Sequence, residues 1–226
     1  DKEVARAGSQ GRGAAMHVCA SGLSAQEKRQ VQEAAHHVGL TWEADLVCEC
    51  THLISNTVSS KKYRMAVENR LPVLRKEWLL DSQAQLTLLP ESSYLLPPLY
   101  RLHITVSGVT FGPSDRDRVE ALVVAQGGRL HRELNKDCTH LVVDAPRGDK
   151  YEHALKSHEC AHVKVVACEW LLACLQQGAC VDEAPYVLPR RAEPCLSSCV
   201  VHAWPGSASD AQQQQLAARQ LARVRR

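Results

Sequence analysis

Apolar positions recur along the first part of the chain with the period of a strand and then with that of a helix. Residues 17–20 are mostly apolar and predict a short strand that ends in a turn at Ser21-Gly22. Ser24 and Glu27 have the spacing of a capping box, which begins a helix. Gly39 ends that helix. The apolar face of the predicted helix is made by Val31, Ala34, Ala35 and Val38.

Three further strands and two helices complete this first unit. A weak strand is expected at residues 40–43, a third at 50–54 and a fourth at 73–74, after Pro72. Ser59-Ser60 has the composition of a cap for the second helix, and a third helix begins at Glu77 and carries Trp78 into the core. The order is β-α-β-β-α-β-α. Crossover helices in this order give a small four-stranded parallel sheet that is covered on both faces.

The same order returns in the second half of the chain. Strands are expected at residues 102–106, 128–130, 141–143 and 163–166, and the loop before the first helix of this half is two residues longer than in the first unit. That helix begins at Pro113-Ser114 and ends at Gly127-Gly128. The last helix begins at Trp170 and ends at Gly178. The fold class is therefore α/β, with two similar units in tandem, each a parallel sheet flanked by three helices.

Two stretches of equal length show that the units arose by internal duplication. Residues 50–66 read CTHLISNTVSSKKYRMA and residues 138–154 read CTHLVVDAPRGDKYEHA, at an offset of 88. The offset is 86 at the Ser-Gly turn and 92 at Glu-Trp-Leu-Leu, and each increase falls in a polar stretch. Loop insertions into a fixed core produce such a pattern. The units so predicted span residues 14–95 and 101–190.

The remaining segments differ in composition from the two units. Residues 96–100 form a short linker, apolar and rich in proline, which predicts that the units pack closely. Residues 1–13 are rich in Gly, Ser and charge and are expected to be disordered. Residues 191–226 are expected to be a mostly disordered basic tail, with a short helix over 210–226 as the alternative.

Composition excludes some classes of protein but indicates no particular ligand. The chain of 226 residues is 45% apolar and has a formal net charge of only +2, so an anion site would have to be local rather than a broad basic surface. There is no signal peptide pattern and no apolar run of the roughly eighteen residues that a membrane span requires. We expect an intracellular protein, and a chain that begins at Asp1 rather than Met suggests part of a longer one.

The ten cysteines do not have the spacing of a structural zinc site. Cys48-x-Cys50-x-His52 lies at an expected strand, and Cys195-x3-Cys199-x2-His202 lies in the tail. Cys138, Cys168 and Cys174 occupy apolar positions and are expected to be small buried residues of a reducing compartment. We therefore predict no metal site and no cofactor.

Each unit brings a hydroxyl, an exposed backbone amide and a lysine to the carboxyl edge of its sheet. The Ser-Gly turn follows the first strand, and the lysine begins the helix that follows the adjacent third strand. A helix N-terminus has unpaired N–H groups and a positive dipole, so a nearby ammonium makes a phosphate site. A second cation stands in the first turn of each opening helix. The candidate phosphate-binding residues are Ser21, Gly22, Lys28 and Lys62, and Ser107, Gly108, Arg116 and Lys150.

Taken singly, each of these residues has a simpler explanation. A lysine at a helix start is most often a solvated charge, and a serine before glycine is most often a turn residue. The recurrence of the whole set in two diverged units favours a binding function.

Several of these motifs together resemble the breast-cancer C-terminal repeat, or BRCT domain. The motifs are Ser-Gly after the first strand, Gly-Gly after the first helix, Cys-Thr-His-Leu, Lys-Tyr-x-x-Ala and the late tryptophan, and the resemblance covers residues 15–188. The first unit departs from the pattern, because Val38-Gly39-Leu40 replaces Gly-Gly and makes its second strand uncertain. Within the family, the pair is most similar to the group of DNA topoisomerase 2-binding protein 1, whose N-terminal repeats each carry a serine and a lysine.

The resemblance implies a nuclear scaffold of checkpoint signalling, DNA repair and replication initiation that binds phosphoserine or phosphothreonine motifs. The implied partners are phosphorylated proteins, such as the tail of the checkpoint clamp or treslin-like firing factors, with no membrane and no small-molecule substrate. It also implies that the eight residues named above hold the phosphates.

Two other functions remain open from the sequence. The chain could bind DNA through the same anion sites, or be the targeting fragment of a larger replication or repair enzyme, although the low net charge and few aromatic residues disfavour DNA. Catalysis is the least favoured, since His52 and His140 occupy strand positions and no nucleophile–base set, carboxylate pair or Walker loop is present.

Overall fold

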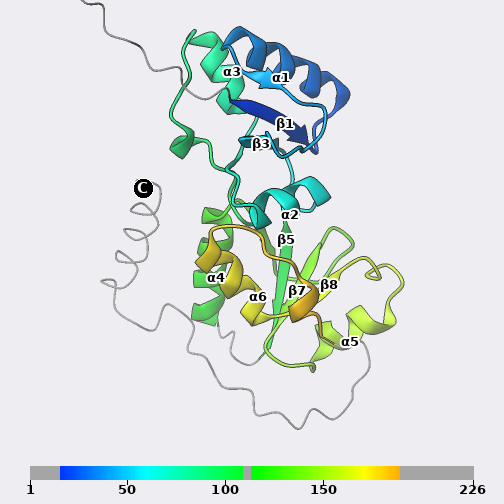
Figure 1. The fold of residues 1–226 in the computed structure, drawn as a ribbon. Coiled ribbons are helices and arrows are strands. Elements are labelled where there is room, and N and C mark those ends of the chain that lie inside the picture. Colours follow the sequence, from blue (N-terminus) through cyan, green and yellow to red (C-terminus); the bar gives the residue numbers. More distant parts are fainter. Residues whose placement is uncertain (1–15, 109–112, 189–226) are drawn as a thin grey trace, which may run out of the picture.

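The computed structural model describes residues 16–108 and 113–188, which form two α/β repeats of the same design (Figure 1). The first repeat contains β1 (His17–Ser21), α1 (Ala25–His37), β2 (Thr41–Trp42), β3 (His52–Ser55), α2 (Lys61–Glu68), β4 (Val73–Leu74), α3 (Glu77–Ala84) and the 3₁₀ helix η1 (Glu91–Ser93). The predicted order β-α-β-β-α-β-α is confirmed.

The second repeat follows the same sequence of elements. It contains β5 (His103–Ser107), α4 (Pro113–Ala125), β6 (Arg129–His131), β7 (His140–Val143), α5 (Asp149–Lys156), β8 (Lys164–Ala167), α6 (Cys168–Gln177) and the 3₁₀ helix η2 (Ala184–Tyr186). Within the described residues, no helix is long and apolar enough to span a membrane.

Both sheets are parallel and have the same strand order, β2-β1-β3-β4 and β6-β5-β7-β8. The first strand of each repeat therefore lies beside the third, with Ser21 opposite Ser55 and Ser107 opposite Val143. Because parallel strands end at the same edge, the Ser-Gly turn and the helix after the third strand meet at the carboxyl edge of each sheet.

Side-chain caps explain where α1 and α2 begin, and glycines explain where α4 and α6 end. The Ser24 side chain accepts from the Glu27 amide, and the Glu27 carboxylate accepts from the Ser24 amide, which is the capping box that the sequence predicted. The Ser60 side chain caps α2 by accepting from the Tyr63 amide. Gly127 and Gly178 have positive φ at the ends of α4 and α6, in the conformation that glycine adopts at the least cost.

The apolar core lies in three groups of buried side chains, and one of them joins the repeats. Helices α1 and α3 cover one face of the first sheet, with Trp78 fully buried. Helix α5 covers the face of the second sheet that is opposite to α4 and α6. The third group connects α2 of the first repeat with α4 and α6 of the second, and includes Tyr63, Val119 and Trp170. The linker contributes Leu96 and Leu99, so the predicted close packing of the repeats is confirmed.

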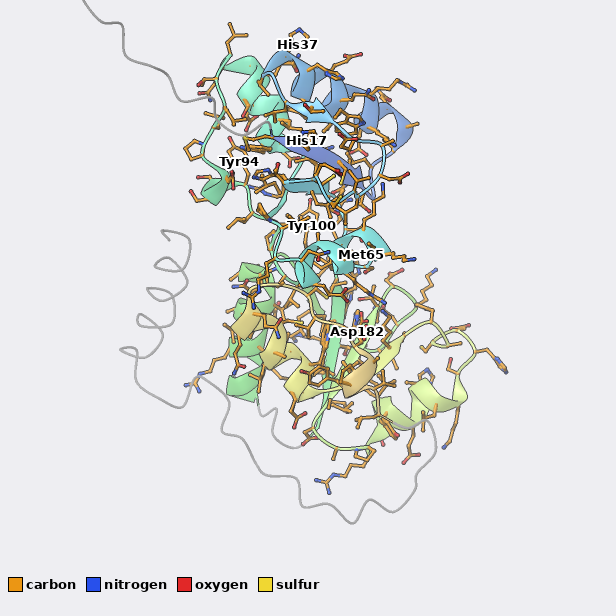
Figure 2. All side chains as sticks on the ribbon, in the orientation of Figure 1. His17, His37, Met65, Tyr94, Tyr100 and Asp182 are labelled. Atoms are coloured by element: carbon orange, nitrogen blue, oxygen red, sulfur yellow. The ribbon has the colours of Figure 1, made fainter. Side chains whose placement is uncertain are left out.

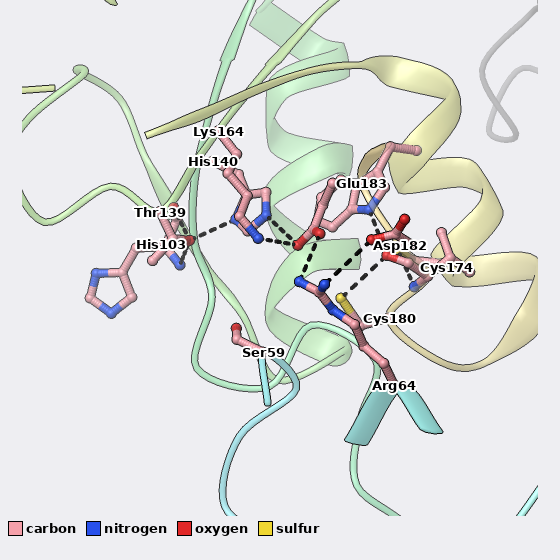
Figure 3. Close-up of polar contacts among 12 residues, drawn as sticks. Ser59, Arg64, His103, Thr139, His140, Lys164, Cys174, Cys180, Asp182 and Glu183 are labelled. Atoms are coloured by element: carbon pink, nitrogen blue, oxygen red, sulfur yellow. Dashed lines mark hydrogen bonds and ion pairs between the residues drawn. The ribbon is translucent and has the colours of Figure 1, made fainter. Parts of the chain in front are cut away.

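Polar contacts reinforce this junction. The Tyr63 hydroxyl on α2 accepts a buried hydrogen bond from the Cys180 amide at 2.9 Å. The Arg64 guanidinium, also on α2, lies 3.4 Å from Glu183 and 3.7 Å from Asp182 (Figure 3). Met65 on α2 and Tyr100 in the linker mark the same junction in Figure 2.

The structure shifts several predicted boundaries. The third strand begins at His52 rather than residue 50, because Cys50 still closes the preceding turn, where its amide donates to the Val47 carbonyl. The uncertain second strand is present but only two residues long, Thr41–Trp42. The last helix begins at Cys168, two residues before Trp170. The tails predicted at 1–13 and 191–226 and the loop insertion around 109–112 lie outside the described residues.

Buried cysteines are a feature of both repeats. Cys138 and Cys174 are buried as predicted, whereas Cys168 is only partly buried. Among the described residues, no group of three or more His, Cys, Asp and Glu side chains is arranged to hold a metal ion.

Candidate functional site

The candidate residues of the first repeat surround one cavity at the carboxyl edge of the sheet. This first cavity has a volume of about 350 Å³. The end of β1, the turn after it and the first turns of α1 and α2 form its wall. The lining residues include Ser21, Gly22, Lys28, Ser60, Lys61 and Lys62. All four residues proposed from the sequence for this repeat are therefore brought together.

Two serines connect the turn to the start of α2. The Ser21 hydroxyl donates to Ser60 Oγ at 2.7 Å, and Ser60 is also the cap of α2. Gly22 has φ +71°, and a Cβ there would come within 2.5 Å of the Thr57 side chain. A larger residue is therefore excluded at Gly22, and the turn stays close to the helix N-terminus.

Lys62 is held at the cavity by the loop that follows β2. Its ammonium donates to the Ala44 carbonyl at 2.9 Å and lies 3.0 Å from Asp45 Oδ1. Asp45 is 82% exposed, and the hydrogen bond and charge of Lys62 lower the pKa of its carboxyl group, with a smaller contribution from Lys28. Such an exposed ion pair is weak, so an arriving dianion can compete for the ammonium.

The second repeat holds its lysine in a related way, but more deeply. The Lys150 ammonium donates to Thr105 Oγ1 at 3.1 Å, to the Val106 carbonyl at 3.2 Å and to the Arg132 carbonyl. Burial lowers the pKa of Lys150, and the charge of Arg116 lowers it further.

A second cavity, of about 430 Å³, lies beside Lys150. It brings Arg116 and Lys150 together, as the sequence predicted. Neither Ser107 nor Gly108 is among its lining residues, which are Val106, Arg116, Asp117, Glu120, Leu130, His131, Arg132 and Lys150.

Ser107 and Gly108 face the start of α5 instead. A Cβ added at Gly148, the residue before α5, would lie 3.4 Å from Ser107 Oγ. A Cβ added at Gly108 would collide with the carboxylate of Asp144. The turn thus approaches the helix start in both repeats. Among the described residues, the turn and both cations line one cavity in the first repeat, whereas the cavity beside Lys150 in the second repeat is lined by both cations and not by the turn.

Several residues of these sites were not foreseen. Ser60 was predicted as a cap but not as a partner of Ser21. The carbonyl groups that hold the lysines belong to Ala44 and Arg132, which are 88 positions apart, as Lys62 and Lys150 are. Asp45 and Glu133 follow at the same offset. Alignment of the loops after the second strands would have revealed this acidic position, whereas the carbonyl contacts depend on no residue type.

The repeated histidines have structural partners. His140 stacks on Trp170 with ring centroids 4.6 Å apart, and Thr139 Oγ1 lies 2.9 Å from its Nδ1. His52 stacks on Trp78 at 5.4 Å. A glutamate lies at Nε2 of each ring, Glu91 for His52 and Glu183 for His140. These contacts support the structural role that the sequence assigned to both rings.

A comparison with models of protein families shows which family the chain belongs to. The family model described as the twin BRCT domain matches residues 16–78 and 102–170. The chain belongs to the twin BRCT family. This agrees with the repeated parallel sheets, and the two matched segments correspond to the two repeats described above.

Individual proteins of similar sequence are longer than this chain. The S-M checkpoint control protein rad4 of Schizosaccharomyces pombe is 27% identical over 186 residues, which cover 78% of this BRCT pair and 28% of rad4. PAX-interacting protein 1 of Bos taurus is 36% identical over 118 residues, covering 51% of this chain and 12% of that protein. The chain thus spans less than a third of either relative.

Two solved structures of Rad4 BRCT1,2 resemble the BRCT pair over most of its length. One, in complex with an Mdb1 phosphopeptide, has a TM-score of 0.68 at 26% identity and covers 77% of this chain and 97% of that chain. The other, in complex with a Crb2 phosphopeptide, has a TM-score of 0.67 at 26% identity, and covers 76% and 97%.

Proposed function

We propose that this BRCT pair is a non-enzymatic scaffold module that binds phosphoserine or phosphothreonine motifs, with one phosphate site in each repeat. The observation that carries the proposal is the first cavity, where a hydroxyl, a backbone amide and three lysines converge on the start of α2. The Rad4 BRCT1,2 structures in complex with phosphopeptides support the same ligand class.

A phosphorylated side chain suits the first cavity chemically. It has close to two negative charges at neutral pH and three acceptor oxygens. Ser21, the Gly22 amide, Lys28 and Lys62 offer four donors, and charge-assisted hydrogen bonds contribute about 1.5–3 kcal/mol each before association costs. Affinity on the order of micromolar follows.

In the second repeat, Ser107, the Gly108 amide, Arg116 and Lys150 would hold the phosphate. Arg116 and Lys150 already share a cavity wall. Ser107 lies at the start of α5, where Gly148 leaves space beside it. The ligand would therefore bridge from the turn to the cavity.

The partners that we propose are phosphorylated proteins of DNA-damage checkpoint signalling and replication initiation, and the location that we propose is the nucleus. The similarity to the checkpoint control protein rad4 supports both. A checkpoint-clamp tail and treslin-like firing factors remain the finer expectation from the family.

Fluorescence anisotropy with matched phosphorylated and unphosphorylated peptides tests the proposal. The phosphorylated peptide should bind at least about tenfold more tightly, a difference of about 1.4 kcal/mol. Lys62→Glu together with Lys150→Glu should abolish that preference, whereas Lys136→Glu, which changes a lysine outside both cavities, should preserve it. Equal binding of both peptides would disprove the proposal, and salt-sensitive binding of DNA in its place would support the nucleic-acid alternative.

A further inference from the structure

Equivalent positions around the two cavities differ systematically in charge. Helices α1 and α4 both place a cation at their fourth residue, Lys28 in the first repeat and Arg116 in the second. The next residue is Arg29 in α1 but Asp117 in α4, and the eighth residue is Gln32 in α1 but Glu120 in α4. The charge beside the cation that both repeats share is therefore more negative in the second repeat.

The same change occurs on the other side of each cavity. The first residue of the helix that carries the lysine is Lys61 in α2 and Asp149 in α5. The residue after the third strand is Asn56 in the first repeat and Asp144 in the second. These positions lie on different elements, so the reversal is spread around the site.

Eight equivalent positions show this difference in charge, some of them among the lining residues of the cavities and the others on the same helices and loops. The first set has four cations and one carboxylate, and the second has three cations and five carboxylates. The first set is Lys28, Arg29, Gln32, Ala44, Asp45, Asn56, Lys61 and Lys62, and the second is Arg116, Asp117, Glu120, Arg132, Glu133, Asp144, Asp149 and Lys150.

The charged side chains that differ are placed to act on a ligand. Asp117 and Glu120 are exposed and line the second cavity beside Arg116, whereas no carboxylate is among the residues that line the first cavity. Charges within a Debye length of about 8 Å act on one another at physiological salt. A peptide bound through its phosphate would bring its neighbouring residues within that range.

We infer that the two repeats read opposite charge contexts, resting on the proposed phosphopeptide function. The first repeat selects a phosphorylated residue with acidic neighbours, and the second selects one with basic neighbours. A glutamate beside the phosphate is attracted by Lys61 and Arg29 in the first site but is repelled by Asp117 and Glu120 in the second. A lysine has the reverse preference.

The hydrogen bonds of Lys150 are a second reason why a phosphorylated residue bound in the second repeat would need a basic neighbour in the peptide. Three protein oxygens, from Thr105, Val106 and Arg132, already accept its hydrogen bonds. The ammonium that meets a phosphate is therefore more occupied here than in the first site. A cation of the peptide, paired with Asp117 or Glu120, would supply the missing attraction.

The experiment uses the full chain with one site disabled at a time. Lys150→Met leaves the first site, and Lys62→Met leaves the second, because methionine keeps the aliphatic stem and removes the charge. Three phosphothreonine peptides, flanked on both sides by glutamates, alanines or lysines, are titrated by fluorescence anisotropy, each against its unphosphorylated form. The first site should prefer the glutamate peptide and the second the lysine peptide, each by about tenfold at low salt, and both preferences should shrink as salt screens the charges.

Charge exchange provides a second arm that leaves the partly buried Lys150 in place. In the Lys62→Met chain, Asp117→Arg with Glu120→Gln copies the first repeat and should turn the preference toward the glutamate peptide. Glu159→Arg, an exposed change in the loop before β8 at the opposite edge of the sheet, is the control and should leave the preference unaltered.

The outcomes separate this inference from the proposed function. Phosphate-dependent binding with the same order of the three peptides at both sites, or an order that the exchange does not alter, would overturn the inference and leave the proposed function intact. Binding that does not depend on the phosphate would overturn both.

Discussion

Each candidate lysine is positioned by a backbone carbonyl of the loop after the second strand. Lys62 donates to Ala44, and Lys150 donates to Arg132, the equivalent residue. The lysines themselves could be predicted from the sequence, because their spacing from the Cys-Thr-His-Leu motif is the same in both repeats. Their anchors could not, because a carbonyl group is present at every residue and its direction depends on the loop.

At Ser21, binding can be tested by the removal of a single hydroxyl group. Ser21→Ala removes a hydroxyl that donates to Ser60 in the free protein and that would exchange this acceptor for a phosphate oxygen on binding. Affinity for a phosphopeptide at the first site should fall about fivefold, since one hydrogen bond contributes roughly 1 kcal/mol. The measurement is an anisotropy titration in the Lys150→Met chain.

Ser59→Ala is the matched control for that change. Ser59 is exposed and adjacent to Ser60, and its amide rather than its side chain bonds to Thr57 Oγ1. The control should bind as the parent does. Equal loss of affinity in both variants would mean that the Ser21 hydroxyl has no specific role.

At the scale of elements, the start of α1 was easier to predict than the start of β3. The capping box of α1 is a local pattern, and the structure forms it with both reciprocal hydrogen bonds. The start of β3 depends instead on its register with β1, which places His52 beside Val18. Register is set by partners distant in sequence, so a residue pattern alone placed this strand two positions too early.

The capping box makes a measurable contribution to stability. Ser24→Ala should lower the free energy of unfolding by about 1 kcal/mol, because the Glu27 amide loses its side-chain partner at the start of α1. Chemical denaturation followed by circular dichroism measures the change. Gln30→Ala, an exposed change within the same helix, should be neutral or slightly stabilising. A loss of stability no greater for Ser24→Ala than for Gln30→Ala would contradict this role of the cap.

At the scale of the whole molecule, the sequence predicted part of the junction between the repeats. The proline-containing linker indicated close packing, and the structure buries Leu96 and Leu99 in the shared core. The sequence did not indicate which helix forms the junction. That role belongs to α2, whose Tyr63 and Arg64 contact the segment after α6 more than one hundred positions away.

A buried acidic residue at this junction predicts how stability depends on pH. Glu183 is 6% exposed and lies near Lys164, His140 and Arg64 at 2.7, 3.4 and 3.4 Å (Figure 3). Burial alone would raise the pKa of Glu183, but the hydrogen bonds from His140 and Lys164 outweigh it and lower the pKa from 4.5 to about 2. Burial also lowers the pKa of His140 below its usual 6.5.

Both pKa shifts make the folded state less stable as the pH falls. A group with a lowered pKa in the folded state stabilises the fold above its unfolded pKa and loses that contribution as the pH falls. The free energy of unfolding should therefore decrease as the pH falls below 6.5, through His140, and decrease further from 4.5 toward 2, through Glu183. Denaturant titrations across this range measure it, and Glu183→Gln should flatten the more acidic part. Stability that is constant or rises on acidification would refute the assignment.

The central claim is that each repeat holds a phosphate where its Ser-Gly turn meets the start of the lysine-bearing helix. An NMR titration of the full chain with a phosphothreonine peptide tests it directly, through the backbone amide signals of Gly22 and Gly108. Both signals should shift on addition of the phosphorylated peptide and neither on addition of the unphosphorylated one. Shifts that are confined to other surfaces, or that are the same with and without the phosphate, would contradict the account.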